Sequence, residues 1–525
     1  MRLFIIITII YEAALFVFST YDICCTTQDD AYHIVMFHSH YPYLQHFVHY
    51  LTHTATRPLF TFLIRVPYWI DSLLFYKFVS YSAFFAEIVA LYLLIRKLFD
   101  YPIALLFVII HLAFLQYTFQ HNILFAYPFY FHFAIFLFVL SLLLFIEFLQ
   151  NGKLIFYFLS ILFYMTVLMM YEVFVVYGLL FLVIVYIYRA PWKLFIGYLA
   201  PILLLIVLHF YLQTFFDRQY SGTTLHFRSL KDFLITLILH TSSAFPLFNT
   251  IFIHKLHQLY FLDKDFYRGL SFSFNIFSLL DWRSYLKALL VFGSSYYLLQ
   301  RGVQSKKEYK NAIILLLILV FLPNILLALT KKYQIWAVQY HNFHYVTTYF
   351  SVIAFNLLIV ISVFYWVKSN KRRTLVTALL FGIVSLLVDY GNYYPLRALK
   401  LSSQRWHIVK ALAHSKLLPK ELHCIEAPSL WSHTYSDIKM GSGYWSSYFK
   451  AEGGTVSIEK NKRCPAKMVI LQNPIKTTTI VRIDFANQSY LLALQKIPLP
   501  SIQWEKSDGI FMAKVKKGFV PIGFH

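Results

Sequence analysis

Long runs of apolar residues dominate the first three quarters of the chain, separated by short polar or basic segments and two longer ones. Runs of about 17 to 25 apolar residues are long enough to cross a hydrocarbon core of about 30 Å. Backbone inside a bilayer must satisfy its own hydrogen bonds, so we interpret these runs as helices. The pattern predicts eleven spans, over residues 3–19, 73–95, 101–118, 129–149, 154–170, 172–188, 194–212, 284–300, 311–329, 345–367 and 374–391.

The first run follows Arg2 and resembles a signal peptide. No small-residue cleavage site stands out in residues 11–25, so we expect an uncleaved first transmembrane helix.

Basic residues between the spans predict the orientation, because short cytoplasmic loops are enriched in Lys and Arg. With a cytoplasmic N-terminus, the short outer loops hold only Lys331 and Lys332. The inner positions then hold Arg2, Arg96, Lys97, Lys153, Arg189, Lys193, Arg301, Lys306, Lys307, Lys310, Lys368, Lys371, Arg372 and Arg373. We therefore predict a multi-pass protein of the cell inner (cytoplasmic) membrane.

The segment 233–253 is apolar enough to span, but His240, Ser242, Ser243 and Pro246 interrupt it. If it spanned, the basic clusters at 301–310 and 368–373 would face outward. We therefore interpret residues 213–283 as one outer loop whose helices lie in the interface or re-enter the membrane. Residues 20–72 form a second long outer loop.

After Pro395 the composition becomes polar, and residues 396–525 are predicted to form an extracytoplasmic domain. A helix is expected over 402–418, and short strands over 467–472, 479–485 and 510–514. Cys424 and Cys464 can form a disulfide if this region lies outside the cytoplasm. The fold class is thus an all-α polytopic membrane protein, with residues 1–395 in the membrane domain, and a small C-terminal α+β domain.

Composition agrees with this class. The chain is 59% hydrophobic and 13% charged, whereas a soluble protein has about 25% charged residues. The net charge of +22 is spread over loops and the C-terminal tail. Because it is spread in this way, it does not indicate a nucleic-acid partner, and none is expected. The basic C-terminal domain can lie against anionic membrane lipids.

Two adjacent acids, Asp29 and Asp30, follow the first span at the predicted outer boundary. A carboxylate there can be the general base for an acceptor hydroxyl. It can also bind a divalent cation, Mg²⁺ or Mn²⁺, beside a phosphate leaving group. A solvated polar loop is the alternative interpretation.

Arg57 and Arg65 lie in the same outer loop, each in an apolar context. A guanidinium there suits a phosphate, and snorkelling from an interfacial helix is the alternative. Tyr171 and Glu172 lie between two spans with almost no loop, where an acid indicates function unless it simply reaches water. His121 and Asn122 belong to the preceding outer loop and can join the same site.

Cationic and aromatic residues gather in one outer turn, around the start of the tenth span. Such a mixture suits a phosphate and the face of a sugar, although an interfacial aromatic belt has the same composition. The candidates are Lys331, Lys332, Tyr333, His341 and His344, and the same group contains Trp336, Tyr340 and Tyr345. Two histidines three residues apart are weak evidence for a metal.

The arrangement resembles the GT-C superfamily of membrane glycosyltransferases. The motifs behind the resemblance are Asp29-Asp30 after the first span, Thr56-Arg57-Pro58-Leu59 in the large outer loop, and Tyr171-Glu172. Bacterial members similar to protein O-mannosyltransferases, aminoarabinose transferases and O-antigen glucosyltransferases share this outline.

The resemblance implies sugar transfer from a polyprenyl-phosphate-linked donor to a glycan, lipid or protein acceptor at the outer face. By it, Asp29 is the base, with Asp30 beside it. Arg57, with Arg65, Lys331 or Lys332, holds the donor phosphate, and Glu172 contacts the acceptor or a metal. A transporter or flippase for a lipid-linked envelope component, and a non-catalytic assembly or sensor protein, are the alternatives.

Overall fold

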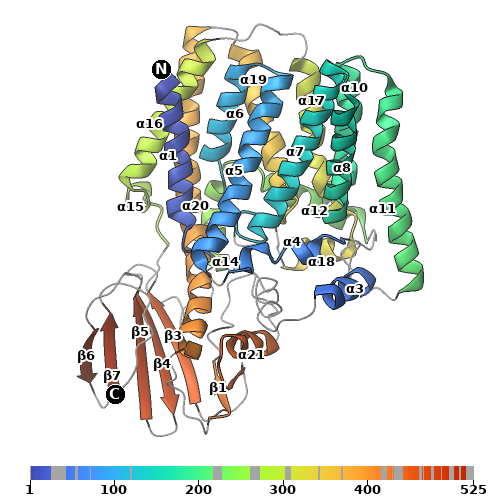
Figure 1. Ribbon diagram of the computed structural model, residues 1–525. Helices are drawn as coiled ribbons and strands as arrows, with labels where there is room; N and C mark the ends of the chain where they lie inside the picture. The colour runs from blue at the N-terminus through green and yellow to red at the C-terminus, as the bar shows by residue number, and fades with distance from the viewer. Residues whose placement is uncertain are drawn as a thin grey trace.

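The protein is a bundle of long helices with a β-sheet at one end, as the computed structural model in Figure 1 shows. Seven of the described helices are long and apolar enough to cross a membrane. These are α1 (Arg2–Thr20), α5 (Leu73–Leu98), α7 (Pro128–Asn151), α11 (Ile196–Phe215, preceded by the turn η2 at Trp192–Phe195), α17 (Tyr309–Ala328), α19 (Thr348–Val367) and α20 (Lys371–His414). The chain is therefore a largely helical, membrane-embedded protein, as its composition predicts.

The structure describes residues 2–24, 43–53, 57–70, 72–118, 121–216, 228–260, 272–301, 309–340, 343–367, 370–414, 422–427, 430, 442–459, 464, 466–473, 478–485, 488–495, 502–507 and 510–515.

The other four predicted spans coincide with shorter, broken or more polar helices. They are α6 (Tyr101–Ala113), α8 (Leu154–Met170), the pair α9 (Phe174–Tyr177) and α10 (Leu179–Ile187), and α16 (Trp282–Gln300). Gly178 separates α9 from α10, and a Cβ at this residue would lie 2.3 Å from the Tyr164 hydroxyl. The break therefore occurs where the backbone packs tightly against α8.

The predicted span 101–118 is helical only as far as Ala113, which corrects its outer end. The backbone beyond it is satisfied by side chains from distant elements. Asn392 donates to the carbonyl of Leu115 at 2.8 Å and accepts from the amide of Tyr117 at 2.9 Å. Irregular backbone at membrane depth needs such protein partners, and a local sequence pattern does not reveal them.

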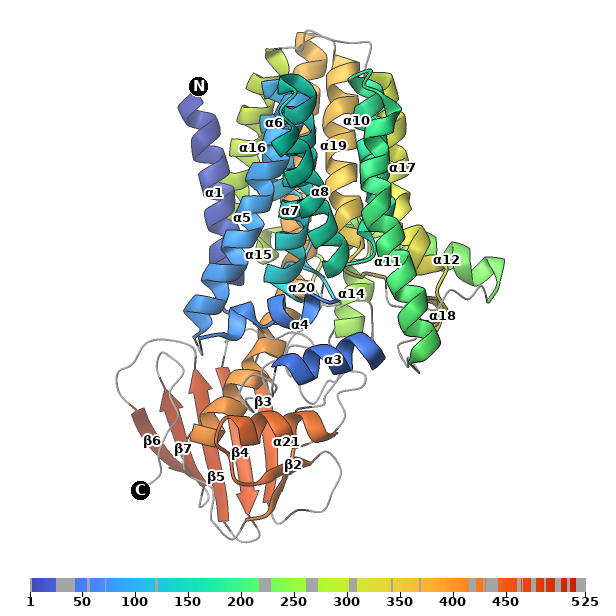
Figure 2. The same ribbon diagram turned by 45° about the vertical axis from the view of Figure 1, so that its right-hand side comes forward.

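The region 233–253 contains no described helix long enough to span. It holds α12 (Leu230–Ser242) and α13 (Phe248–Ile251), followed by α14 (Ile253–Tyr260) and α15 (Ile276–Leu279). Figure 2 shows α12 projecting sideways from the bundle. The polar interruption noted in the sequence is thus where the helix ends.

One helix, α20, joins the bundle to the region beyond it. It runs for 44 residues with Pro395 inside it. The helix expected over 402–418 is thus present over 402–414, as the last part of α20. It continues the predicted span 374–391 without a break, which the sequence did not predict. Proline is tolerated here since neighbouring helices can satisfy the freed carbonyl.

A seven-stranded sheet lies at the end of the bundle opposite the N-terminus, which we call the sheet end (Figures 1 and 2). The strands are β1 (Cys424–Glu426), β2 (Ser457–Glu459), β3 (Ala466–Asn473), β4 (Thr478–Phe485), β5 (Gln488–Gln495), β6 (Ile502–Ser507) and β7 (Ile510–Val515). Their order is β2-β1-β3-β4-β5-β7-β6. The meander β3–β4–β5 is antiparallel, whereas β1 pairs in parallel with β2 and β3. Strands β3, β4 and β7 lie where the sequence predicted them.

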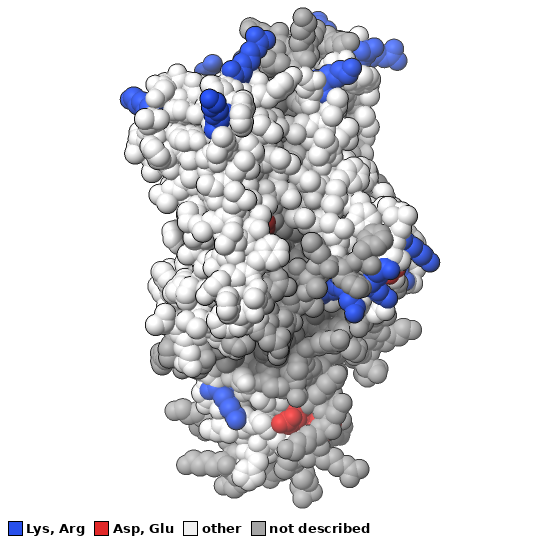
Figure 3. Space-filling model, turned by 90° about the vertical axis from the view of Figure 1, so that its right-hand side faces the viewer, with Lys and Arg blue, Asp and Glu red and all other residues white. Residues whose placement is uncertain are grey.

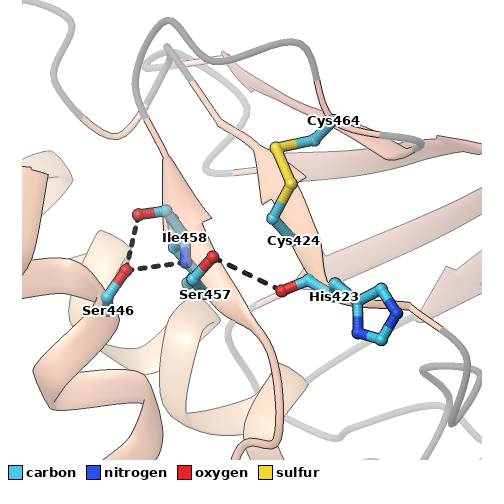
Figure 4. The surroundings of a disulfide bond; sticks show 6 residues. All are labelled: His423, Cys424, Ser446, Ser457, Ile458 and Cys464. Atoms are coloured by element: carbon cyan, nitrogen blue, oxygen red, sulfur yellow. Dashed lines mark hydrogen bonds between the residues drawn. A yellow bond between two sulfur atoms is a disulfide. The ribbon is translucent and has the colours of Figure 1, made fainter.

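The helix α21 (Ser442–Ala451) packs against both the sheet and α20. Ser446 accepts a hydrogen bond from the amide of Ile458 and donates one to its carbonyl, which fixes α21 on β2 (Figure 4). The rings of Trp406 on α20 and Trp445 on α21 lie 4.4 Å apart. The sheet is thereby attached to the end of the last long helix.

A disulfide joins Cys424 and Cys464, whose Cα atoms are 5.5 Å apart (Figure 4). The bond closes a loop across 40 residues and ties β1 to the segment before β3. The pairing that the sequence left open is thus present.

Removing this disulfide is expected to destabilise the sheet. For a loop of 40 residues, the chain-entropy model gives about 4 kcal/mol. The variant Cys424→Ser/Cys464→Ser should show faster amide exchange in β1 and β3 than the unchanged protein. Cys24→Ser, at a buried cysteine outside the disulfide, is the control and should leave exchange in these strands unchanged; equal protection in both variants would contradict the expectation.

Basic residues gather at the other end of the bundle, which we call the basic end. Arg96 and Lys97 end α5, Lys153 precedes α8, and Arg372 and Arg373 begin α20. Figure 3 shows Lys and Arg along this edge and a broad band with almost no visible charge beneath it. Such a band has the character of surface buried in lipid.

Candidate functional site

Several short helices lie across the sheet end of the bundle (Figure 2). They are α3 (Tyr43–His53), α4 (Phe60–Leu63), the turn η1 (Val66–Tyr68) and α18 (Lys331–Tyr340). The first three belong to the long loop predicted between the first two spans. Asp29 and Asp30, in the same loop, lie outside the described residues.

The backbone just after α1, which leads toward the acidic pair, is hydrogen-bonded to α5 and to α20. Lys77 of α5, only 4% exposed, donates to the carbonyl of Thr20 at 2.7 Å and also to that of Ile23. Ser403 of α20 accepts from the amide of Cys24 at 2.8 Å. The loop therefore begins from a fixed point between α5 and α20. The signal for Lys77 in the sequence is a lysine inside an apolar run, a position that predicts a buried partner.

Arg57 and Glu172 form a bidentate ion pair, the arginine–glutamate pair. Nε of Arg57 donates to Oε2 of Glu172 at 2.6 Å, and Nη2 donates to Oε1 at 2.5 Å. The guanidinium also lies 4.6 Å from the centre of the Tyr171 ring. The Arg57 side chain is 10% exposed and that of Glu172 35%. Such a fork is geometrically specific and stronger than a contact between neutral groups.

The turn between α8 and α9 presents Glu172 to the loop. The amide of Leu59 donates to the carbonyl of Met169 at 3.3 Å, and the hydroxyl of Tyr130 donates to that of Met170. Burial raises the pKa of the Glu172 carboxyl, but the charge and hydrogen bonds of Arg57 outweigh it, so the pKa lies below its ordinary value. The carboxylate is thus ionised at neutral pH.

Arg65 is among the largest fully buried side chains, with 1% exposure. It caps η1 just after α4. This burial does not fit a guanidinium that snorkels into water from an interfacial helix. Its assignment to the donor phosphate stays a prediction.

A second group of candidates forms what we call the aromatic shelf: His121, Lys332, Tyr333, Trp336 and Tyr345. The Lys332 ammonium lies 4.6 Å from the Trp336 ring centre, and the hydroxyls of Tyr333 and Tyr345 are 2.8 Å apart. The His121 ring lies 5.4 Å from Tyr345 and 5.8 Å from Trp336. The shelf thus joins α18 to the loop before α7, as the sequence grouping anticipated for its residues between 332 and 345.

His121 adopts a positive φ of 38°, which is uncommon for a residue with a Cβ. Such backbone strain concentrates at functional sites. The side chain of the neighbouring Asn122 makes hydrogen bonds within the same loop. Its Nδ2 donates to the backbone carbonyl of Gln116, and its Oδ1 accepts from the backbone amide of Leu124. Asn122 therefore shapes the loop that carries His121.

His344 lies beneath the shelf with 3% exposure. Burial, together with the nearby imidazoles of His240 and His121, lowers its pKa to about 3, so the ring is neutral. His341 is outside the described residues, and Lys331 is exposed at the start of α18. His240, on α12, is a neighbour that the sequence pattern did not connect to this group.

Among the described residues, no group of three or more His, Cys, Asp or Glu side chains is placed to hold a metal ion. The predicted metal ligands, Asp29 and Asp30, fall outside those residues, so the divalent cation stays a prediction.

Comparison of the sequence with protein-family models gave no match, and comparison with curated proteins gave none either.

Proposed function

We propose that the protein is a GT-C-type glycosyltransferase that moves a sugar from a polyprenyl-phosphate-linked donor to an acceptor hydroxyl outside the cytoplasm. The observation that carries the proposal is the arginine–glutamate pair at the sheet end. It joins a cation suited to phosphate, in the loop that also bears Asp29 and Asp30, to a carboxylate in the turn between α8 and α9. The acceptor is an envelope glycan, lipid or protein.

In this mechanism the Asp29 carboxylate accepts the proton of the acceptor hydroxyl. The acceptor oxygen bonds to the anomeric carbon of the sugar as the bond from that carbon to the phosphate oxygen breaks. Polyprenyl phosphate leaves, and its negative charge is stabilised by Arg57 and Lys332.

The pair gives Arg57 a defined orientation. Glu172 accepts from Nε and from one terminal nitrogen, and a guanidinium has five N–H donors in a rigid plane. The Tyr171 ring, 4.6 Å from the guanidinium carbon, adds a second contact to the same group. Glu172 thus acts as a positioning residue in this proposal, alongside its assignment to the acceptor.

The lysine and rings of the aromatic shelf suit the remaining parts of the donor. An aromatic face packs against the apolar face of a sugar, and Lys332, above Trp336, adds positive charge beside it. Cationic and aromatic groups at one level of a membrane protein suit a head group whose lipid tail stays in the bilayer.

The proposal includes eleven spans, a cytoplasmic basic end and an extracytoplasmic sheet end. The concentration of basic residues at the N-terminal end supports this orientation. The Cys424–Cys464 disulfide supports it as well, because such bonds persist in oxidising compartments.

Impermeant thiol labelling tests the orientation. In a protein whose native cysteines are replaced by serine, Asn275→Cys at the sheet end should react in intact cells, whereas Lys153→Cys should react only after permeabilisation. Both parent residues are exposed in the structure. The reverse pattern would overturn the orientation.

The activity is tested in proteoliposomes that contain the full chain and a mixed pool of polyprenyl-phosphate sugars from membranes. Release of free polyprenyl phosphate, followed by mass spectrometry, reports transfer whatever the sugar is. The expected result is release that depends on protein and on added acceptor extract. Failure to consume any donor with any acceptor fraction would overturn the proposal.

A transporter or flippase is the second candidate, because ionisable groups inside the bundle mark many transport pathways. Glu87 of α5 and His132 of α7 are both fully buried and 2.5 Å apart. Movement of the donor between leaflets without its consumption, in the same proteoliposomes, would favour this candidate.

A further inference from the structure

A cavity of about 540 Å³ lies between α1, α15, α16 and α20. These helices lie on the other side of the bundle from α18 (Figures 1 and 2). The volume is in the usual range for small-molecule sites, about 300–1,000 Å³. Its lining includes Glu12, Lys287, Asp389 and Asn392, and toward water Arg283 and Lys400. It shares no residue with the arginine–glutamate pair or the aromatic shelf.

Glu12 occupies the closed end of this cavity. It lies eight residues before Thr20, the last residue of α1, which places it about 12 Å along the helix axis from that end. Its exposure is 3%, whereas the Arg283 side chain at the opening is 55% exposed. Among the residues that the structure describes, neither carboxylate oxygen of Glu12 has a hydrogen-bond partner.

The one cation near Glu12 in the deep part of the cavity is already engaged, as far as the described residues show. Nζ of Lys287 donates to Oδ1 of Asp389 at 2.5 Å and to the carbonyl of Ala113 at 3.2 Å. Both Lys287 and Asp389 act electrostatically on Glu12. The Lys287 ammonium is thus bound by Asp389 and by the Ala113 carbonyl. A single further cation beside Glu12 would give both carboxylates an ionic partner.

The Glu12 carboxyl at this end, which has no hydrogen-bond partner among the described residues, suits an ammonium group. A primary ammonium has three donors and no strict geometry, so it can satisfy Glu12 and reach Asp389 as well. A buried carboxylate without such a partner is strongly disfavoured.

We propose that this cavity binds a small polar molecule through its primary amine, which the Glu12 carboxylate holds at the closed end beside the Lys287–Asp389 pair. The rest of the molecule lies toward Asn392 and the basic residues at the opening. The site is separate from the proposed transfer reaction and does not depend on it.

Equilibrium binding to the full chain in nanodiscs tests this site at pH 7. The probes are radiolabelled ethanolamine and glucosamine, each compared with its N-acetyl derivative, which keeps the skeleton and loses the charge. The expected result is saturable binding of the amines and at least about tenfold weaker binding of both N-acetyl forms. Equal binding of the two forms, or binding of neither, would overturn the proposal.

Two variants assign the binding to Glu12. Glu12→Gln keeps the shape of the side chain and is expected to weaken amine binding at least about tenfold. Glu147→Gln removes a carboxylate at the basic end, outside the cavity lining, and should leave binding unchanged. Unchanged amine binding by Glu12→Gln would show that Glu12 does not hold the amine. If that variant does not fold, the comparison of amine with N-acetyl probe in the unchanged protein still decides.

Discussion

The double variant Asp29→Asn/Asp30→Asn is expected to lose sugar transfer almost completely, with polyprenyl phosphate release lower by about 10²–10⁴-fold. Asparagine has nearly the same shape as aspartate but cannot accept a proton from the acceptor hydroxyl. The loop that carries the pair starts from a point fixed by Lys77 and Ser403, so the backbone leading to it should be unchanged. Initial rates in proteoliposomes, at equal amounts of inserted protein, measure the effect.

A matched loss of two carboxylates elsewhere at the sheet end is the control. Asp232 lies in the first turn of α12 and Glu459 on β2; neither belongs to the proposed site. Asp232→Asn/Glu459→Gln should retain nearly full transfer. Full transfer by the Asp29/Asp30 variant would remove the general base from the proposal, whatever the control does.

Breaking the arginine–glutamate pair is expected to have the second largest effect. Glu172→Gln removes the ionic partner of Arg57, a residue that is only 8% exposed when backbone and side chain are counted together. Arg57→Lys keeps the positive charge but cannot form the two parallel hydrogen bonds. Because misplacement of a binding group can cost about 10²-fold in rate, we expect each variant to lower transfer by about 10–10²-fold. The measurement is kcat and KM for the donor.

A double-mutant cycle with Arg57→Gln and Glu172→Gln separates this contact from general damage. The coupling in the free energy of unfolding should be about 1–3 kcal/mol. Arg283 and Asp281, 4.0 Å apart and both more than half exposed, supply the comparison pair, with a coupling of at most about 0.5 kcal/mol. Because the Glu172 pKa is lowered in the folded protein, the stabilisation should be present at neutral pH and disappear as acid protonates the carboxyl. Equal coupling in the two pairs would contradict the role of the fork.

Local patterns in the sequence anticipated much of the helical part. Apolar runs and basic turns are local properties, so α5, α7, α17 and α19 lie within a few residues of their predictions. The antiparallel strands β3 and β4 were found for the same reason, since their pattern is contained in eight residues each.

Local sequence patterns could not predict contacts between residues that lie far apart in the chain. Arg57 and Glu172 were each predicted as candidate site residues. They are 115 residues apart in the sequence, and no local pattern predicts that their side chains form an ion pair. Asn392 satisfies the irregular backbone after α6 across 277 residues, which is why the end of that helix was placed too late. The change to a polar composition after Pro395 predicted a boundary there. Although proline ends most helices in water, the packed bundle sustains α20 through it.

Because α20 is one continuous helix, the number of residues in it determines both the distance and the rotation between the bundle and the sheet. From Asp389, beside the cavity, to Trp406, against α21, the chain is one helix, so each residue contributes about 100° of rotation and 1.5 Å of rise. A single insertion in this stretch would turn the sheet by roughly a quarter of a circle around the helix axis relative to the bundle. The number of residues in this stretch therefore determines how the sheet is rotated relative to the bundle. Deletions here should be tolerated only when they remove close to a whole helical turn.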